Sequence, residues 1–318
     1  GMVIGTLWIF APYIAWLLSQ KIVIESKITK ENKEYLQTIA LETWKYFEES
    51  FTKENNYLVP DNYQVGRKNS FVTRTSSTNI GLEILSIMSA YDLKFITLEK
   101  CTDMIRKVIE TIEKLIKWNG HLYNWYNIKT LEPLKPEYIS TVDSGNFVGY
   151  LYVLRTFLKL KEIDPILEKA VEKLIEETNF KYLYSEKHRL FSIGFDVTSN
   201  KLTDSYYDFL ASEARQTSFI AIAKKDIKYK HWINLSRTLT SQNGLKGLIS
   251  WSGTAFEYTM PNLIMKVPEG SLLNESCKFA LACQINYANK NQIPFGISES
   301  AYSLKDLQGN YQYKAFGI

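Results

Sequence analysis

The chain has 318 residues, of which 45% are hydrophobic and 23% charged; this is typical of one large globular domain or two ordinary ones and excludes a disordered protein. The formal net charge of +4 is spread along the chain without a long basic block, which argues against a nucleic-acid partner. The three cysteines (Cys101, Cys277 and Cys283) lack CxxC spacing and the three histidines lack paired ligand spacing, so we expect buried thiols in a reducing compartment, no disulfide and no metal site.

The chain opens with a strongly apolar segment, residues 3–18, which is interrupted by Pro12. The segment is somewhat short for a bilayer span and lacks the basic start of a signal peptide. Two interpretations stay open: a segment that docks on the domain, or the tail end of a membrane region.

Helical periodicity and stop signals predict a mostly helical protein with about nine helices. Thr78 or Asn79 is expected to cap the second helix, and the Asn119-Gly120 pair is expected to stop the third. Residues 182–202 alternate enough to predict a hairpin with a turn at residues 199–200. The predicted helices cover residues 31–51, 80–90, 98–118, 143–161, a segment from 165, then 204–223, 228–236 and 273–290.

Long polar loops rich in glycine and aromatic residues recur at alternate helix connections. This alternation is typical of a closed double ring of helices with its site at the long-loop end. We therefore predict an all-α fold, an (α/α)6 barrel with a small β-hairpin insertion, although the helix count falls short of the twelve in a complete ring. No GxGxxG or Walker sequence follows a predicted strand, so no nucleotide cofactor is expected.

One stretch, DSYYDFLASEAR at residues 204–215, carries a candidate catalytic carboxylate. If it forms one continuous helix capped by Asp204 or Ser205, Glu213 lies on the same face as Phe209. A carboxylate among apolar side chains is costly to ionise, so its pKa rises, as a general acid near neutral pH requires. The structural alternative is a salt bridge to Arg215 or another basic residue.

Two later stretches add carboxylates in similar surroundings. Glu257 lies in SWSGTAFEYTMP (residues 250–261) and Glu299 in PFGISESAY (residues 294–302). Three carboxylates flanked by small polar and aromatic residues suggest a carbohydrate site, because acid/base work on an acetal needs two facing carboxyl groups. The aromatic content of 14% suits sugar stacking, although a crowded helical core explains it equally well.

Seven motifs in chain order closely resemble those of cyclic β-1,2-glucan synthases. They cover nearly the whole chain and match the middle, glucoamylase-like domain of those large membrane enzymes. The motifs are RTSSTNIGL (74–82), GHLYNWY (120–126), YISTVDSGN (138–146), FSIGF (191–195), DSYYDFLASEAR (204–215), LISWSGTAFEYTMP (248–261) and GISESAY (296–302).

The resemblance implies an (α/α)6 transglycosylase that cleaves linear β-1,2-glucan and recloses it into a ring, with Glu299 as nucleophile and Glu213 as acid/base. It implies two neighbouring domains in a longer polypeptide, a glycosyltransferase that makes the glucan and a phosphorylase-like domain that trims it. It also implies a location on the cytoplasmic face of a bacterial inner membrane. Residues 1–28 would be a lead after a membrane region and 29–318 the catalytic domain, whose last helices are missing because the family barrel continues past YQYKAFG (311–317).

Eight further residues are candidate substrate-binding positions. Asp143 is expected either to cap its helix or to bind substrate, and Glu257 either to hydrogen-bond a sugar or to act as a second acid. Arg74 and Arg215 are candidates for orienting carboxylates, while His121 is expected to hydrogen-bond a loop. The candidate stacking platforms, each of which can equally belong to the core, are Trp125, Tyr126, Trp251 and Tyr302.

Two alternatives to ring closure stay open. An endo-β-1,2-glucanase would use the same pocket with water as acceptor. A glucan-binding module, inactive once separated from its neighbours, would bind glucan without turnover.

Overall fold

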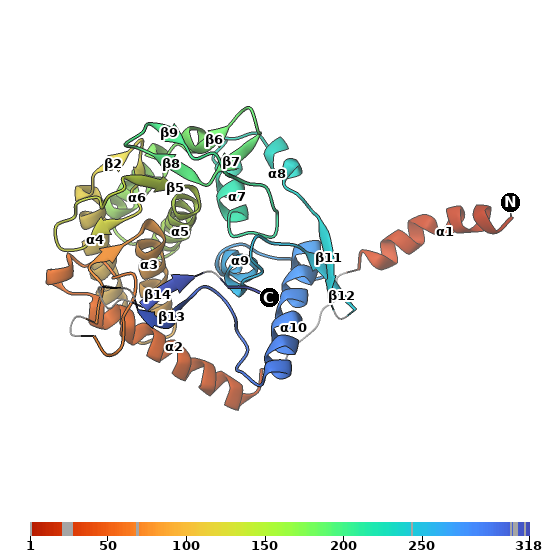
Figure 1. Ribbon diagram of the computed structural model, residues 1–318, viewed down its shortest axis with the longest axis horizontal. Helices are drawn as coiled ribbons and strands as arrows, with labels where there is room; N and C mark the ends of the chain where they lie inside the picture. The colour runs from red at the N-terminus through yellow and green to blue at the C-terminus, as the bar shows by residue number, and fades with distance from the viewer. Residues whose placement is uncertain are drawn as a thin grey trace.

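The structure is a computed structural model that describes residues 2–20, 28–67, 70–242, 244–305, 307, 311–314 and 316–318. Helices dominate these ranges, as predicted, and most of them connect through loops that contain only short strands (Figure 1). The α-helices are α1 (Met2–Leu18), α2 (Lys30–Ser50), α3 (Ser77–Asp92), α4 (Leu98–Lys114), α5 (Thr141–Leu160), α6 (Pro165–Glu177), α7 (Arg215–Ala223), α8 (Lys230–Asn234), α9 (Ala255–Thr259) and α10 (Leu272–Asn291).

Helices α3 to α7 form an inner and an outer layer (Figure 1). Helix α5 packs against α3 on one side and α7 on the other, and these three make an inner row. Helices α4 and α6 lie outside this row, with α4 on α3, α6 on α5, and the two in contact with each other. This inner-and-outer arrangement is the one expected when helices succeed one another in antiparallel pairs.

Amphipathic spacing explains why the outer helices bury only one face. In α4 the buried side chains recur every three or four residues, while the charged ones point to solvent. Each such side chain contributes about 1.5–3 kcal/mol when fully buried. The buried residues of α4 are Cys101, Met104, Ile105, Val108, Ile109, Thr111 and Ile112.

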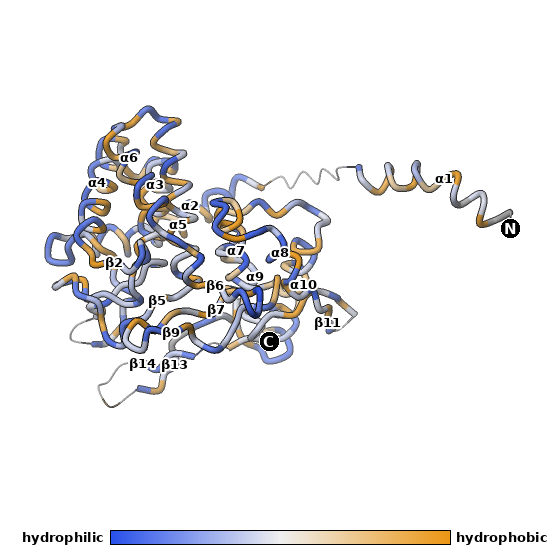
Figure 2. Tube along the Cα trace, turned by 90° about the horizontal axis from the view of Figure 1, so that it is seen from above, coloured by the Kyte–Doolittle hydropathy of each residue, from blue (hydrophilic) through white to orange (hydrophobic). Residues whose placement is uncertain are grey.

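The strands are short and lie in the connections, along one side of the helices (Figure 2). The region 184–202 forms two hairpins that belong to two separate three-stranded sheets, ordered β10-β7-β6 and β5-β8-β9. The strands are β1 (Arg74–Thr75), β2 (Lys117–Trp118), β3 (His121–Leu122), β4 (Tyr126–Asn127), β5 (Tyr138–Ser140), β6 (Tyr184–Ser185), β7 (Leu190–Ser192), β8 (Gly194–Asp196), β9 (Lys201–Leu202), β10 (Tyr206–Tyr207), β11 (Leu239–Gln242), β12 (Leu245–Leu248), β13 (Ser300–Lys305) and β14 (Tyr311–Lys314).

Two predicted helix boundaries are wrong. The third predicted helix was expected to reach residue 118, but α4 ends at Lys114 and β2 pairs with β3 in a hairpin. Asn119 and Gly120 have φ values of 47° and 81°, the left-handed pair of a type I′ turn, so they join two strands and do not stop a helix. Helix α3 is capped by Ser76, whose hydroxyl accepts the Asn79 N–H, and not by Thr78 or Asn79.

Helix α1 carries large apolar side chains that are exposed, with Trp8 79% and Leu18 82% accessible. It is therefore not packed on the domain, which was one of the two interpretations of this segment. Residues 21–27 of the predicted lead lie outside the described residues. Among the residues that the structure describes, no helix has both the length and the apolarity needed to cross a membrane.

The inner helices α5 and α7 approach each other closely at Gly145. A Cβ atom on this glycine would collide with the side chain and backbone of Thr217. Because interior packing is dense, one added methyl group would push the two helices apart.

We expect Gly145→Ala to lower the free energy of unfolding by about 1–3 kcal/mol, the usual range for overpacking. Chemical denaturation measures this change. Gly5→Ala is the matched control, because nothing lies within 4 Å of that position, so the added methyl should be neutral or slightly stabilising. Equal effects of the two substitutions would contradict the close approach.

Candidate active site

The candidate catalytic carboxylates come from three connections at the strand-rich side of the helices. Asp143 lies in the first turn of α5, Glu213 immediately before α7, and Glu299 immediately before β13. Hydrogen bonds join the stretch at Arg215 to the Glu257 turn and that turn to Ser298, and the negative charges of Asp143, Glu299 and Glu257 all raise the pKa of Glu213.

Glu213 does not lie within a helix, so the prediction of one helix over residues 204–223 is wrong. Tyr206 and Tyr207 pair with β7 as β10, and the chain turns before α7 begins at Arg215. The Ser205 carbonyl accepts the Ile193 N–H, so it serves the sheet and not a helix cap. Backbone pairing with β7 thus overrides the helical periodicity of this stretch.

The predicted environment of Glu213 is nevertheless present. Burial raises the pKa of the Glu213 carboxyl well above its usual range, and the nearby charges of Asp143, Glu299 and Glu257 raise it further. No cation forms a salt bridge with this side chain in the described part of the chain. A raised pKa favours the protonated form of the carboxyl group, which is the form that a general acid needs.

Arg215, the expected structural partner of Glu213, points elsewhere. Its guanidinium is buried and donates to the carbonyls of Ser212, Glu257 and Tyr258 and to Asn262 Oδ1, at 2.7–3.1 Å. Burial lowers the pKa of Arg215 to about 10. The side chain therefore ties the start of α7 to α9 and orients no carboxylate.

Glu299 lies at the end of a loop that two neighbouring helices hold in place. The Gln284 side chain of α10 pairs with both backbone groups of Ile297, at 2.7 and 2.9 Å. The Ser298 hydroxyl accepts the Phe256 N–H at 3.1 Å, which attaches the loop to α9. From the far side, the hydroxyl of Tyr313 on β14 donates to Glu299 Oε2.

Asp143 occupies the third position of α5 and is not its cap. Ser140 is the N-cap, because its hydroxyl accepts the Asp143 N–H. The Asp143 carboxylate is thus free of the capping role that was one expectation for it, and it accepts the Asn124 Nδ2–H at 3.2 Å.

Glu257 is committed to its own turn. It forms a capping box with Thr254 at the start of α9. Its carboxylate also accepts the backbone N–H and hydroxyl of Ser252 and the hydroxyl of Ser250, at 2.9–3.2 Å. These donors give the buried side chain a structural role and leave little acceptor capacity for a sugar or for acid catalysis.

The four predicted stacking platforms have different surroundings. Trp251 is 49% exposed and meets Tyr207 edge-on, and Tyr302 is 38% exposed. Trp125 is partly buried beneath the Arg74 guanidinium, 4.6 Å from its ring centroid. Tyr126 is wrong as a platform, because it is fully buried, with its hydroxyl donating to the Ile116 carbonyl and accepting the Tyr123 N–H.

Arg74 contacts a different carboxylate from those predicted. Its guanidinium forms a salt bridge with Asp61 at 3.1 Å, and Asp61 also accepts the Asn79 side chain. Arg74 lines a polar cavity of about 700 Å³ together with Gln64, Tyr311 and Tyr313. His121 is a loop hydrogen-bonder, as expected: its Nε2 contacts the Asn179 carbonyl, and burial lowers its pKa to about 4.

Sequence reasoning missed Tyr207 and Tyr313 as neighbours of the carboxylates. The charges of Glu213, Asp143 and Glu299 raise the pKa of Tyr207, after burial as the main cause. Both tyrosines lie in motifs that were noted, DSYYDF and YQYKAF, but the helical assignment of the first hid its strand geometry. Within the described residues no group of three His, Cys, Asp or Glu side chains is placed to hold a metal ion.

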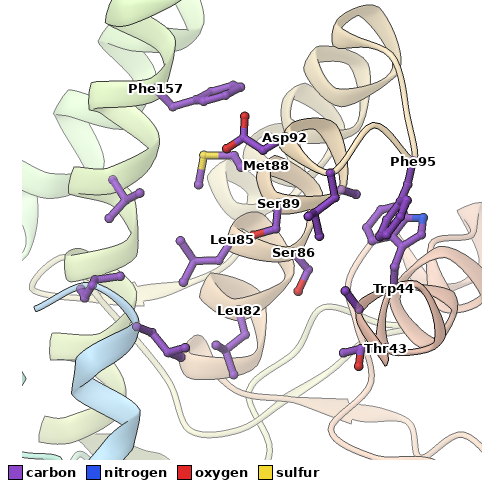
Figure 3. A pocket seen from close by; sticks show the side chains of 16 residues that line it. Thr43, Trp44, Leu82, Leu85, Ser86, Met88, Ser89, Asp92, Phe95 and Phe157 are labelled. Atoms are coloured by element: carbon purple, nitrogen blue, oxygen red, sulfur yellow. The ribbon is translucent and has the colours of Figure 1, made fainter. Parts of the chain in front are cut away.

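A second cavity, of about 600 Å³, lies between α2, α3 and α5 and is lined mostly by apolar side chains (Figure 3). Phe157 of α5 faces Met88 and Asp92 of α3, and Trp44 of α2 lies beside Phe95. Asp92 is the one carboxylate among its lining residues, so the cavity lacks the paired acid groups gathered around Glu213.

A family model described as "Protein of unknown function (DUF3131)" matches residues 38–203, just over half of the chain. The chain belongs to this family. The part matched to DUF3131 contains Arg74, Trp125 and Asp143, whereas Glu213 and Glu299 come after it.

A curated relative of this DUF3131 chain is the cyclic β-(1,2)-glucan synthase NdvB of Rhizobium meliloti (strain 1021), at 28% identity. The alignment covers 100% of this chain, which spans 16% of the length of NdvB. The resemblance predicted from the seven motifs is therefore confirmed.

Two solved structures share the fold of this DUF3131 protein. An endo-β-1,2-glucanase from Chitinophaga pinensis, in complex with sophorotriose and glucose, has a TM-score of 0.73 at 13% identity, covering 89% of this chain and 74% of that one. A structure from Bacteroides fragilis NCTC 9343, described as a candidate glucoamylase, has a TM-score of 0.72 at 14% identity, covering 93% and 75%. The helix-rich, glucoamylase-like class predicted from sequence is confirmed, while closure into a six-pair ring and the single hairpin insertion stay predictions.

Proposed function

We propose that this domain cleaves linear β-1,2-glucan and recloses it into a ring by retaining transglycosylation. One observation carries the proposal: burial and neighbouring negative charges, that of Glu299 among them, raise the pKa of the Glu213 carboxyl well above its usual range. Retaining glycosidases need such a pair, one carboxyl that is an acid and one that is a nucleophile. The glucan itself is proposed from the similarity to NdvB and to the C. pinensis glucanase.

In the first step Glu299 attacks the anomeric carbon, and the bond from that carbon to the bridging oxygen breaks. Glu213 gives its proton to the departing oxygen, directly or through a substrate hydroxyl. In the second step the 2-hydroxyl at the other end of the same chain attacks the glycosyl-enzyme, its proton returns to Glu213, and Glu299 is released. Asp143 keeps the Glu213 pKa high through its charge and is proposed to bind substrate.

Ring closure without hydrolysis requires that water be kept from the glycosyl-enzyme. Tyr207, which the charges of Glu213, Asp143 and Glu299 reach, and its neighbour Trp251 supply aromatic surface that suits both sugar stacking and water exclusion, and Tyr302 is proposed to add to it. If water is the acceptor, the same pocket is an endo-β-1,2-glucanase. If the chain only binds glucan, it is a binding module that is inactive when separated from its neighbouring domains.

The larger setting is also a proposal. Because the chain spans 16% of NdvB, we place residues 29–318 as the catalytic domain of a longer polypeptide with glycosyltransferase and phosphorylase-like neighbours. Residues 1–28 are proposed to follow a membrane region on the cytoplasmic face of a bacterial inner membrane. The exposed apolar side chains of α1 are compatible with that placement.

Product analysis by mass spectrometry tests the function. We expect wild-type protein incubated with linear β-1,2-glucan to give products lighter than linear chains by one water molecule, and Glu299→Gln to give none. Glu99→Gln, an exposed change outside the site, is the matched control and should behave like wild type. Linear fragments that disappear in Glu299→Gln would indicate the glucanase, and saturable binding without turnover by any variant would indicate the binding module.

A further inference from the structure

The β13–β14 hairpin carries a candidate nucleophile and its hydrogen-bond partner on the same short element. Strand β13 begins directly after Glu299, and Tyr313 on β14 pairs with Ala301. This register returns Tyr313 to a place beside Glu299, where its hydroxyl donates to Glu299 Oε2. In the described part of the chain Glu299 has no other side-chain hydrogen bond, so Oε1 is left free.

The Tyr313 hydroxyl is suited to be a permanent donor. Partial burial, the hydrogen bond to Glu299 and the negative charges of Glu299, Glu213 and Asp61 raise the pKa of Tyr313. The phenol therefore keeps its proton at neutral pH. The residue as a whole is 64% exposed, so it contributes little to core packing. Its contact with Glu299 is therefore the interaction whose loss the Tyr313→Phe substitution tests.

The hairpin is itself anchored across the site. The Tyr311 N–H donates to Gln64 Oε1 and the Tyr311 hydroxyl to the Val65 carbonyl, both at 3.2 Å. Glu299 is thus fixed from two directions, by the α10 and α9 contacts of residues 297–298 and by a strand attached to the loop at residues 64–65. A carboxylate held on both sides is preorganised, and preorganisation of reacting groups is a large source of rate enhancement.

We propose that Tyr313 is a positioning residue, which holds Oε2 of Glu299 so that Oε1 is presented to the anomeric carbon. The nucleophilic role of Glu299 on which this rests is part of the proposed function. A charge-assisted hydrogen bond of this kind is about twice as strong as a neutral one, so it both orients the carboxylate and resists its rotation.

Tyr313→Phe tests the proposal in the full chain. We expect kcat on β-1,2-glucan to fall by about 10–100-fold with KM within about threefold, because the variant loses transition-state geometry and not ground-state binding. Tyr258→Phe is the matched control: it also removes one tyrosine hydrogen bond, the 2.6 Å contact to the Leu248 carbonyl, but at a buried structural position. That variant should lose stability and keep kcat. An unchanged kcat in Tyr313→Phe, or a rise in KM alone, would overturn the proposal.

A second measurement does not depend on the substrate. The ¹³Cζ resonance of Tyr313, identified by its absence from Tyr313→Phe, reports on the hydrogen bond of its hydroxyl, so Glu299→Gln should shift this resonance and Glu99→Gln should leave it unchanged. If wild-type protein leaves β-1,2-glucan untouched but the resonance behaves this way, the glucan assignment fails and the Tyr313–Glu299 pair stands. A resonance that is the same in wild type and Glu299→Gln would disprove the pair whatever the substrate.

Discussion

Glu213→Gln is expected to lower kcat on β-1,2-glucan by about 10²–10⁴-fold in a protein that still folds. Glutamine keeps the shape of the side chain but has no proton to give to the departing oxygen. A β-1,2-linked diglucosyl fluoride, whose fluoride leaves without a proton, should lose far less of its first-step rate. That difference between substrates separates loss of the acid from damage to the pocket.

The pH dependence follows from the same group. Burial and the charges of Asp143, Glu299 and Glu257 raise the Glu213 pKa above the ordinary 4.5, so the folded protein holds this proton more tightly than the unfolded chain. As pH rises above about 4.5, the unfolded chain releases this proton while the folded protein still holds it. The free energy of unfolding therefore falls with rising pH until the folded-state pKa is reached. Activity that needs the proton falls over the upper part of this range.

Glu213→Gln removes this titration, so the variant should be far less active yet more stable than wild type at pH 8, with the difference in stability shrinking towards pH 4.5. Thermal unfolding across this pH range measures it. Glu83 of α3 is also buried with a raised pKa, but it acts equally in both proteins and cancels in the comparison. Glu99→Gln is the control. A Glu213→Gln variant with wild-type turnover would remove Glu213 from the mechanism.

Arg215→Met is expected to lower the free energy of unfolding by about 2–5 kcal/mol, because several buried oxygen atoms lose a charged hydrogen-bond donor. Methionine fills much of the volume but leaves the Glu257 carbonyl without its side-chain donor and the Tyr258 carbonyl with only the weak Cys277 S–H donor. Each unsatisfied buried acceptor costs about 1–3 kcal/mol. Since Arg215 joins the start of α7 to α9, the stretch that holds Glu213 should loosen as well.

Arg237→Met provides a matched comparison within the same chain. Arg237 also donates to backbone carbonyls, those of Trp232, Ile233 and Leu235, but its side chain is exposed, so water can replace it. We expect a loss below about 1 kcal/mol, measured by urea denaturation alongside Arg215→Met. Equal losses in the free energy of unfolding would show that the buried hydrogen bonds of Arg215 stabilise the fold no more than the exposed ones of Arg237.

Sequence patterns were reliable where one periodicity dominates a long segment. Helices α2 and α10 begin and end within one residue of their predicted bounds, and Asp164-Pro165 starts α6 as expected. The patterns failed where strand pairing between distant segments competes with helical spacing. The helical spacing of the residues around Tyr206 and Tyr207 predicts a helix, but the backbones of these two tyrosines pair with Ser192 and Phe191 of β7.

The candidate site was predictable in its chemistry but not in its supporting contacts. The raised pKa expected for Glu213 is present and burial is its main cause, although the carboxyl is buried in a turn before α7 and not on a helical face, and three other carboxylates raise the pKa further. The position of Tyr313 depends on a hairpin register, and no local rule places a tyrosine beside a carboxylate fourteen residues earlier. The commitment of Glu257 to its own turn likewise depends on three-dimensional contacts.

The order of the elements along the chain has a consequence for biosynthesis. The β13–β14 hairpin follows every helix that the structure describes, yet it supplies Glu299 and returns to the loop at residues 64–65. A ribosome releases the N-terminal helices first, so α2 to α9 can pack before the hairpin emerges. In the proposed mechanism, a domain whose synthesis has not yet passed residue 299 holds Glu213 without its partner carboxylate, so the pair of catalytic groups is complete only after this segment has emerged.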